Sequence, residues 1–429
     1  MYLCLMRFDD YRISEDIKNN LNAMGFLRPT DIQFKCIPHI QNGEDLLAIA
    51  QTGTGKTAAF AIPIIDKIQL NRKRSTGGIR CVVMVPTREL ALQITEVFHA
   101  IGRNTKTKIF CVYGGVEQDK QIAALENGID VLVTTPGRMF DLVSQGYIHL
   151  DQVNTLVLDE ADRMLELGFY KDIEDIIKFI PKNRQTLFFS ATIDKDIKKL
   201  AYSLVRNAIR IQISPKDPVS KNVSHAVAFI EMDDKRFFLE RMMTQNPESK
   251  ILVFVRTKVR AERVKSAMER VKLITDTIHG DKDQNERESV LSQFKTGELK
   301  VLIATDVSAR GIDIPNVDFV INYDMPDKAE NYVHRVGRTG RGTNKGQAFS
   351  FCAKEEKPLL EAVEAYITKP VEVIEIDRED YSNTITFSEG GNDNWRKLMK
   401  DAGENPKVQN SKAKNQKSKT KSQKSKGKR

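Results

Sequence analysis

The stretch LLAIAQTGTGKTAAFAIPII, residues 46–65, decides the fold class. Its first five residues are apolar and typical of a buried strand, and the run AAFAIPII that closes it is helical in character. Gly53 and Gly55 in the loop between them let successive backbone N–H groups point inward. A glycine loop that follows a strand and opens a helix predicts a phosphate-binding loop at a helix N-terminus.

In a loop of this kind, a lysine reaches the β- and γ-phosphates and the next hydroxyl residue can ligate Mg²⁺. Lys56 and Thr57 occupy these two positions. The whole predicted phosphate loop is Ala50, Gln51, Thr52, Gly53, Thr54, Gly55, Lys56 and Thr57. Many such loops have Gly where this one has Ala50. A glycine turn with a solvated lysine is the plainer interpretation, but the order of strand, loop and helix disfavours it.

A second segment, TLVLDEAD at residues 155–162, supplies acids for the same site. Four apolar residues predict a buried strand, and the acids follow at its carboxyl end, where α/β sheets bind ligands. We expect Asp159 to hold Mg²⁺ through water, and Glu160 to orient and deprotonate an attacking water. Alone, an acidic cluster after a strand is more often a solvated helix start. Together with the glycine loop, it favours catalysis.

The segment VHRVGRTGRG, residues 333–342, supplies arginines. At helical spacing, His334, Arg338 and Arg341 share one face. Two rigid guanidinium groups that face a crevice suit a transferring phosphoryl group, so Arg338 and Arg341 are candidate catalytic residues. A basic surface patch is the alternative, but it does not explain why glycines fall between the arginines.

Short β-branched runs alternate with longer amphipathic stretches, which predicts α/β architecture with parallel sheets covered by helices. The expected strands are 46–50, 81–85, 109–113, 131–135, 155–159 and 186–190, then 225–230, 251–255, 276–278, 301–305, 319–323 and 348–351. Between the two sets, ISPKDPVSKN reads as a linker with a hinge near Asp217. We expect two tandem doubly wound domains, 1–212 and 223–370, joined by the linker 213–222. An extension, 371–429, follows; it contains one edge strand in VEVIEID and a helical turn in NWRKLM.

The net charge of +9 has an uneven distribution. Lys407–Arg429 contains nine Lys, one Arg and no acid, and subtracting these ten charges leaves −1 for residues 1–406. This tail has almost no apolar residue, so we expect it to be disordered.

Five widely spaced cysteines fit a reducing cytoplasm, and Cys81 and Cys111 are typical of small buried thiols. The opening MYLCLM is too short for a signal core, and no apolar stretch could span a membrane, so we expect a cytoplasmic protein.

These motifs, in this order, resemble the DEAD-box RNA helicases over roughly residues 8–355. GFLRPTDIQ, residues 25–33, resembles the family's adenine-reading Q motif, with Phe8 in the place of its isolated upstream aromatic. The Gln33 amide can pair with the adenine N6/N7 edge. Phe26 offers an apolar surface to the base, and the Arg28 backbone adds a contact. The resemblance implies RecA-like domains and ATP rather than GTP. TLFFSATIDKDIKKLA resembles bacterial relatives of the RhlE type.

The resemblance also implies contacts to RNA, ATP and the coupling machinery. The residues at the implied RNA contacts are Pro86, Thr87, Arg88, Gly114, Gly115, Thr135, Gly137, Arg138, Arg256, Thr257, Gly280, Gln284, Arg287 and Thr305. Gly311 and Asp313 fall in ATDVSARGID, where the family touches nucleotide. The residues that would link hydrolysis to unwinding are Asp162, Ser190, Thr192 and His334.

The implied mechanism is closure of the two domains over ATP, Mg²⁺ and single-stranded RNA, with little sequence preference in the core. We expect the basic tail to add non-specific RNA affinity. Two other classes of function stay open. One is an ATP-gated RNA clamp with slow hydrolysis and little strand separation, and the other is a DNA translocase, which the Q motif disfavours.

Overall fold

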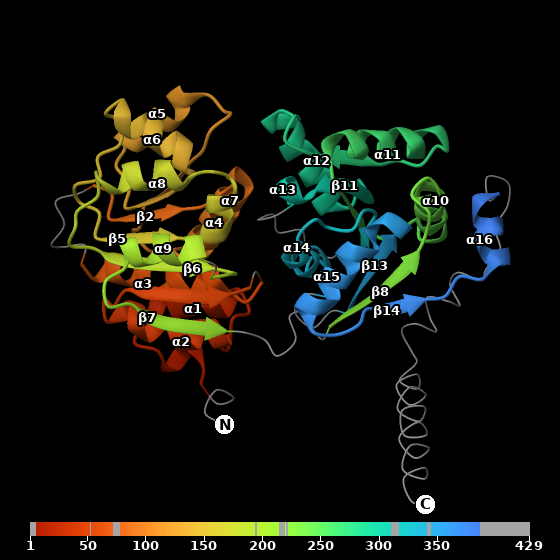
Figure 1. The fold of residues 1–429 in the computed structure, drawn as a ribbon. Coiled ribbons are helices and arrows are strands. Elements are labelled where there is room, and N and C mark those ends of the chain that lie inside the picture. Colours follow the sequence, from red (N-terminus) through yellow and green to blue (C-terminus); the bar gives the residue numbers. More distant parts are fainter. Residues whose placement is uncertain are drawn as a thin grey trace, which may run out of the picture. The chain divides into compact units, whose positions relative to one another are not determined.

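The computed structural model describes residues 6–51, 53–71, 78–193, 195–213, 219, 222–309, 317–340 and 345–386. Over this part the chain forms two compact units, each built on its own seven-stranded sheet (Figure 1). The last strand of the first sheet ends at Ile213, and the first strand of the second sheet begins at Val223. The expected architecture of two tandem doubly wound sheets is confirmed.

The first sheet has the strand order β3-β4-β2-β5-β6-β1-β7, and all its pairings are parallel. Its strands are β1 (Leu46–Ala50), β2 (Cys81–Met84), β3 (Ile109–Val112), β4 (Val131–Thr134), β5 (Thr155–Leu158), β6 (Gln185–Ser190) and β7 (Ile209–Ile213). Six were predicted to within one residue at each end. The seventh, β7, was not predicted, although its sequence IRIQI alternates apolar and polar residues as an edge strand does; only Ile211 is buried.

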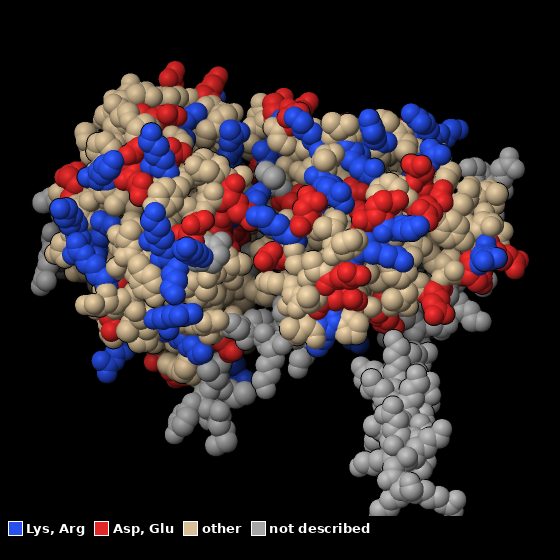
Figure 2. Space-filling view, in the orientation of Figure 1, with Lys and Arg blue, Asp and Glu red and all other residues tan. Residues whose placement is uncertain are grey.

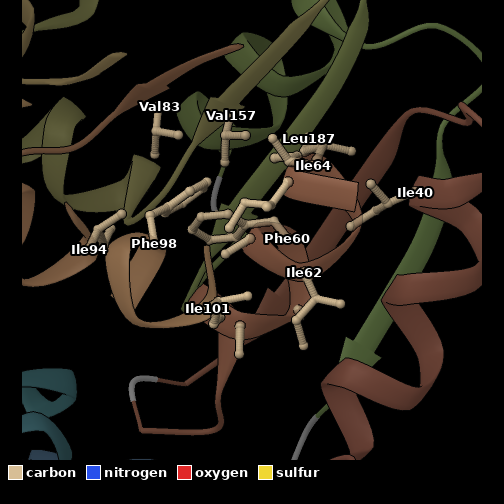
Figure 3. Close-up of a cluster of buried hydrophobic side chains, with 14 of the residues drawn as sticks. Ile40, Phe60, Ile62, Ile64, Val83, Ile94, Phe98, Ile101, Val157 and Leu187 are labelled. Carbon is tan, nitrogen blue, oxygen red and sulfur yellow. The ribbon is translucent and has the colours of Figure 1, made fainter. Parts of the chain in front are cut away.

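Helices cover both faces of this sheet. Side chains of α1 (Glu15–Ala23), α2 (Asp31–Gln41), α3 (Lys56–Leu70) and α4 (Arg88–Ile101) share one apolar cluster with alternate strand residues. Phe60 of α3 lies at its centre, 5.2 Å from the ring of Phe189 and 6.0 Å from that of Phe98 (Figure 3). Burying an aromatic ring of this size contributes roughly 1.5–3 kcal/mol.

The opposite face packs against a second cluster. Its helices are α6 (Pro136–Ser144), α7 (Ala161–Glu166), α8 (Tyr170–Ile177) and α9 (Lys195–Leu204). The strand residues alternate accordingly: Leu46 and Ala48 face the first cluster and Leu47 faces the second. Because both faces are covered, the inner strands of the sheet are mostly apolar, as expected for a parallel sheet. The helices η2 (Phe8–Asp10) and α5 (Gln118–Glu126) also belong to this unit.

The second sheet repeats the first. Its order, β10-β11-β9-β12-β13-β8-β14, is the same when the strands are counted from β8, and its pairings are also parallel. Its strands are β8 (Val223–Phe229), β9 (Ile251–Val255), β10 (Asp276–Ile278), β11 (Val301–Thr305), β12 (Phe319–Asn322), β13 (Gly346–Cys352) and β14 (Glu372–Ile374). The edge strand expected in VEVIEID is confirmed as β14. The helical turn expected at 394–399 lies outside the described residues.

Helices surround the second sheet as well. They are α10 (Lys235–Gln245), α11 (Lys258–Arg270), α12 (Gln284–Thr296), α13 (Asp306–Ala309), α14 (Ala329–Val336), η4 (Lys354–Glu356), α15 (Lys357–Ile367) and α16 (Arg378–Ile385). Helix α16 was not predicted, because its sequence is mostly polar; Tyr381 anchors it, with its ring 5.1 Å from that of Phe238.

A buried ion cluster supports the second unit. Lys235 is fully buried, and its Nζ donates to Glu356 Oε2 at 2.5 Å and to the Tyr323 carbonyl at 2.8 Å. Glu356 Oε1 accepts from Arg256 Nη2 at 2.8 Å. The same carboxylate also accepts from the backbone N–H groups of Met325 and Ala353, both at 3.1 Å. Such a carboxylate is stable in the core only because every lone pair has a partner.

The surface of the described residues mixes both signs of charge. Figure 2 shows Lys and Arg interspersed with Asp and Glu on the visible face of each unit, in agreement with the small net charge of residues 1–406. Cys36, Cys81, Cys111 and Cys352 are buried free thiols, as expected for Cys81 and Cys111. In the part of the chain that is described, every helix is too short or too polar to cross a membrane.

Glu356→Gln should destabilise the second unit by about 3–5 kcal/mol, because it leaves the buried Lys235 ammonium without its main counter-charge. The free energy of unfolding in urea, followed by fluorescence and circular dichroism, measures this change. Glu248→Gln is the matched control, since Glu248 pairs with Lys300 at 3.4 Å with 89% of its side chain exposed. It should cost less than about 1 kcal/mol. Equal costs for the two variants would contradict the assignment.

Candidate functional site

The carboxyl ends of all strands in a parallel sheet lie at one edge, and the strand order decides which loops meet there. In the first unit β5, β6 and β1 are neighbours, so the loops after Leu158, Ser190 and Ala50 are adjacent. These loops carry the predicted acids, the SAT segment and the phosphate loop. The other neighbours, β3, β4 and β2, bring together the three segments that we expected to contact RNA.

The phosphate loop has the backbone that its glycines predict. Gly53 and Gly55 adopt φ of +80° and +90°, a region that L side chains rarely enter. Gly55 forms the N-cap of α3, and a Cβ placed there would lie 2.6 Å from Gln33 Nε2. Thr54 Oγ1 donates to the Gln51 carbonyl at 2.8 Å, which closes the turn. The φ of Gly55 therefore favours glycine, and a larger residue there would also displace the end of the Gln33 side chain.

Lys56 and Asp159 come together at this edge. The Lys56 Nζ lies 3.8 Å from Asp159 Oδ1, and the two side chains are 6% and 4% exposed. Lys56 also donates to the Ala50 carbonyl at 3.1 Å. Burial raises the pKa of the Asp159 carboxyl, and the Lys56 ammonium beside it acts in the opposite direction. Both residues were predicted from the sequence as parts of the nucleotide site, but the ion pair between them was not predicted.

Glu160 has an unusual backbone. Its φ of +52° and ψ of +48° lie in the left-handed region, and it forms the N-cap of α7. Its N–H donates to Asp159 Oδ1 at 3.0 Å. A non-glycine residue in this region costs roughly 1–3 kcal/mol and is concentrated at functional sites. The strain therefore marks Glu160 as a candidate active-site residue.

Asp162 connects the acids to the SAT segment. Its Oδ2 accepts from the backbone N–H groups of Ala191 and Thr192, both at 3.1 Å, and from Thr192 Oγ1 at 3.3 Å. Ser190 is fully buried at the end of β6. The two segments that were expected to couple hydrolysis to unwinding thus share one carboxylate. The coupling role of these residues stays a prediction.

The Q-motif residues lie behind the phosphate loop. Gln33 is 4% exposed; its Oε1 accepts from the Thr30 N–H at 2.8 Å, and its Nε2 donates to the Gly55 carbonyl at 3.1 Å. The amide therefore holds the loop, which sequence reasoning did not foresee, and its expected adenine contact stays a prediction. Phe26 is half-buried and Arg28 is exposed.

Phe8 was expected among the nucleotide-binding residues, and that role stays a prediction. Its ring is 2% exposed and packs in the core, 5.8 Å from the ring of Tyr11. Its N–H donates to the Leu27 carbonyl at 3.3 Å, within the Q motif. In this structure Phe8 therefore supports the Q motif from the core side.

The expected RNA contacts of the first unit meet around a glycine turn. Pro86 and Thr87 follow β2, and Thr87 caps α4 by accepting from the Leu90 N–H at 3.3 Å. Arg88 packs against Gly115, where an added Cβ would lie 2.1 Å from Nη1. Gly114 precedes it in the turn after β3. Thr135 forms the N-cap of α6, whose first turn contains Gly137 and Arg138.

The expected RNA residues after residue 222 also follow strands, those of the second sheet. Thr257 caps α11 by accepting from the Arg260 N–H at 3.2 Å. Arg256 precedes it; its guanidinium pairs with Glu356 at 2.8 Å and with Asp327 at 3.1 Å. Gly280 follows β10, Thr305 ends β11, and Gln284 and Arg287 lie in the first turn of α12. Two carboxylates therefore share the Arg256 guanidinium, and its expected RNA contact stays a prediction.

The helical face predicted for His334, Arg338 and Arg341 is wrong in one respect. Helix α14 ends at Val336, so Arg338 lies beyond it; it is 4% exposed, and its Nε donates to the His334 carbonyl at 3.2 Å. The glycine at 337 forms the C-cap and ends the helix. Four further candidates, Thr52, Gly311, Asp313 and Arg341, lie outside the described residues.

Sequence reasoning missed Arg335. This side chain is 1% exposed and forms a bidentate pair with Asp306, with Nε–Oδ1 at 2.6 Å and Nη2–Oδ2 at 2.8 Å. Its Nη1 donates to the Asp324 carbonyl at 2.7 Å, and its guanidinium lies 5.2 Å from the Phe254 ring centre. It therefore joins the segment after β11 to α14. Its place between His334 and Arg338 was the signal that could have indicated it.

Gly55→Ala should destabilise the nucleotide-free protein more than Gly53→Ala does. Both variants carry the cost of a left-handed backbone, about 1–2 kcal/mol. Only Gly55→Ala also displaces Gln33, which adds an overpacking cost of about 1–3 kcal/mol. Urea unfolding of both variants, and of Gly55→Ala combined with Gln33→Ala, measures the difference. The added Gln33→Ala should recover part of the extra cost, and equal losses in both single variants would refute the close approach.

Comparison with known proteins identifies the family. A family model described as DEAD/DEAH box helicase matches residues 30–200, and one described as helicase conserved C-terminal domain matches residues 234–343. The chain is 40% identical to the ATP-dependent RNA helicase DbpA of Bacillus subtilis over 377 residues, which are 88% of this chain and 78% of that protein. It is 39% identical to the ATP-dependent RNA helicase RhlB of Shewanella woodyi over 393 residues, 90% of this chain and 88% of that one.

Solved structures give the same result. Dbp5 of S. cerevisiae bound to RNA and ADP BeF3 is similar with a TM-score of 0.79 and 29% identity, over 92% of this chain and 99% of that one. Mss116p bound to ssRNA and AMP-PNP is similar with a TM-score of 0.80 and 27% identity, over 90% of this chain and 83% of that one. The expected likeness to the RhlE type stays a prediction. The family models and the curated relatives show that the chain belongs to the DEAD-box ATP-dependent RNA helicases.

Proposed function

We propose that this RNA helicase hydrolyses ATP at the edge formed by β1, β5 and β6, with Lys56, Asp159 and Glu160 as its catalytic residues. The observation that carries the proposal is the buried Lys56–Asp159 pair at 3.8 Å beside a glycine loop of positive φ. A buried ammonium next to inward-facing backbone N–H groups suits the β- and γ-phosphates. Glu160, one residue further along, is the general base.

We infer that Mg²⁺ accompanies ATP, held by Thr57 and Asp159 through water. The chemistry of the donors fits, because Mg²⁺ prefers oxygen ligands and retains several waters. The described residues contain no group of three or more His, Cys, Asp or Glu side chains that could hold a metal ion. The ion would therefore depend on phosphate oxygens for much of its coordination. When bound, it neutralises charge on the phosphates.

We infer that domain 223–370 completes the site when the two domains close on ATP and RNA, with linker 213–222 as the hinge. Arg338 and Arg341 would then stabilise the charge on the transferring phosphoryl group. The nucleotide residues of the first unit follow β1, β5 and β6, and its RNA residues follow β2, β3 and β4. Because both sets share one rigid sheet, binding of RNA and of ATP can favour the same closed state.

The two other readings differ in what they require of this site. A slow RNA clamp would keep the intact acids but separate few duplexes, so duplex separation measured alongside ATP hydrolysis distinguishes it. A DNA translocase would be activated by DNA as well as by RNA. Comparing the rate of ATP hydrolysis with DNA and with RNA therefore tests this alternative. The contacts expected here go to phosphates and 2′-hydroxyls, which favours RNA.

Glu160→Gln should lower RNA-stimulated ATP hydrolysis by about 10²–10⁴-fold, the usual contribution of a general base. The amide keeps the shape of the side chain but cannot take a proton, so binding of labelled ATP analogue and RNA should persist. Steady-state phosphate release and equilibrium binding measure the two effects. Glu166→Gln, on the same helix and paired with Arg163 at 2.7 Å, is the control. Native turnover in the Glu160 variant would remove this residue from the mechanism.

Deletion of Lys407–Arg429 should weaken RNA binding and flatten its dependence on salt, because ten positive charges that release counterions are lost. ATP hydrolysis at saturating RNA should stay near the native rate, since every catalytic residue proposed here precedes the tail. RNA titrations at several salt concentrations give the slope. A tail of equal length with each Lys and Arg replaced by Gln separates charge from length. A native slope in both variants would identify the tail as a solubility or protein-docking segment instead.

A further inference from the structure

Helix α5 packs against the first sheet in an unusual way. Its Ile122 and Leu125 are partly buried against the second apolar cluster, but its one fully buried residue is a glutamine: Gln121, at 6% exposure. A surface helix ordinarily buries apolar side chains, and a buried amide is costly unless it is hydrogen-bonded. Gln121 belongs to none of the segments that identified the family. Its position therefore calls for a specific role.

Both ends of the Gln121 amide are bonded to segments expected to contact RNA. Its Nε2 donates to the Tyr113 carbonyl at 3.0 Å, directly before the Gly114–Gly115 turn. Its Oε1 accepts from Arg138 Nη1 at 3.2 Å. Arg138 Nη2 in turn donates to the Val116 carbonyl at 3.2 Å, directly after the same turn. Gln121 and Arg138 thus fix the two ends of the glycine turn.

The third segment joins at the centre of the turn. Gly115 has φ of +80°, and the Arg88 guanidinium packs so closely that a Cβ at Gly115 would lie 2.1 Å from Nη1. The turn between Gln121 and Arg138 therefore also sets the surface on which Arg88 rests. The described bonds use two of the five N–H donors of Arg138 and leave the others for phosphate oxygens.

We propose that Gln121 is a positioning residue for RNA, which holds Arg138 and the Gly114–Gly115 turn in the geometry that phosphates require. The proposal rests on the proposed function, with the RNA contact that the family resemblance implies for Arg138. Only a neutral amide satisfies both partners, because one end must accept from a guanidinium and the other must donate to a carbonyl. A carboxylate could pair with Arg138, but it would face the Tyr113 carbonyl without a proton and would neutralise the guanidinium. A thioether fills the space with neither bond.

The test measures RNA-stimulated ATP hydrolysis with a single-stranded oligouridine RNA. Gln121→Met and Gln121→Glu should each raise the RNA concentration for half-maximal activation by about tenfold, a loss on the scale of one or two hydrogen bonds with a charged partner. The rate at saturating RNA should stay within about twofold, and the KM for ATP should not change. Gln118→Met is the matched control: it lies on the same helix and bonds to Gln145 at the surface. It should behave as the native protein.

A double-mutant cycle with Arg138→Ala decides whether Gln121 acts through Arg138. In the Arg138→Ala background, Gln121→Met should add less than about threefold. A native RNA requirement for Gln121→Met, or a full tenfold effect in the Arg138→Ala background, overturns the proposal. A lower thermal midpoint together with a higher KM for ATP also overturns it, since a merely structural residue would act in that way. If Arg138→Ala itself binds the RNA normally, the proposed RNA contact fails, and this inference fails with it for a distinguishable reason.

Discussion

A lysine and an aspartate that are both buried at the carboxyl edge of one sheet set the constraint on which the nucleotide site depends. Lys56 and Asp159 are 6% and 4% exposed and 3.8 Å apart. Either charge alone would be expensive to bury, so each requires the other. The pair connects the loop after β1 with the loop after β5, although β6 lies between these two strands in the sheet. The glycines, the strained Glu160 and the Asp162 contact with Thr192 are arranged around this pair.

The strand order divides the edge of the first sheet into two functional halves. The loops after β5, β6 and β1 carry the proposed nucleotide residues, and those after β3, β4 and β2 carry the proposed RNA residues. The second sheet has the same order. Each half has a buried polar residue that organises its loops: Gln33 bonds to the phosphate loop, and Gln121 bonds to the glycine turn. An apolar residue in either place would lose both bonds, because each amide donates through its nitrogen and accepts through its oxygen.

Much of the fold was predictable, because fully buried parallel strands are short runs of apolar residues that can be recognised in isolation. The strands from β1 to β6 are of this kind. Helix α16 was missed, since it is largely polar and is held in place by the contact of Tyr381 with the distant Phe238. Strand β7 was missed although IRIQI alternates as an edge strand does, because it is short and only Ile211 is buried. The helical face assigned to His334 and Arg338 was wrong because spacing alone cannot show where a helix ends; α14 stops at Val336.

The sequence by itself determined the class of fold, the family and the residues of the nucleotide loops, because these depend on residue types at short, fixed spacings. Only the tertiary structure decided which side chains share a partner. Gln33 and Gly55 are 22 residues apart, and Asp162 and Thr192 are 30 residues apart. The burial of Phe8 in the core and the pairing of Arg335 with Asp306 also depend on residues that are far apart in the sequence. Hydrogen bonds and burial depend on distances in space, and the order of strands in the sheet sets those distances.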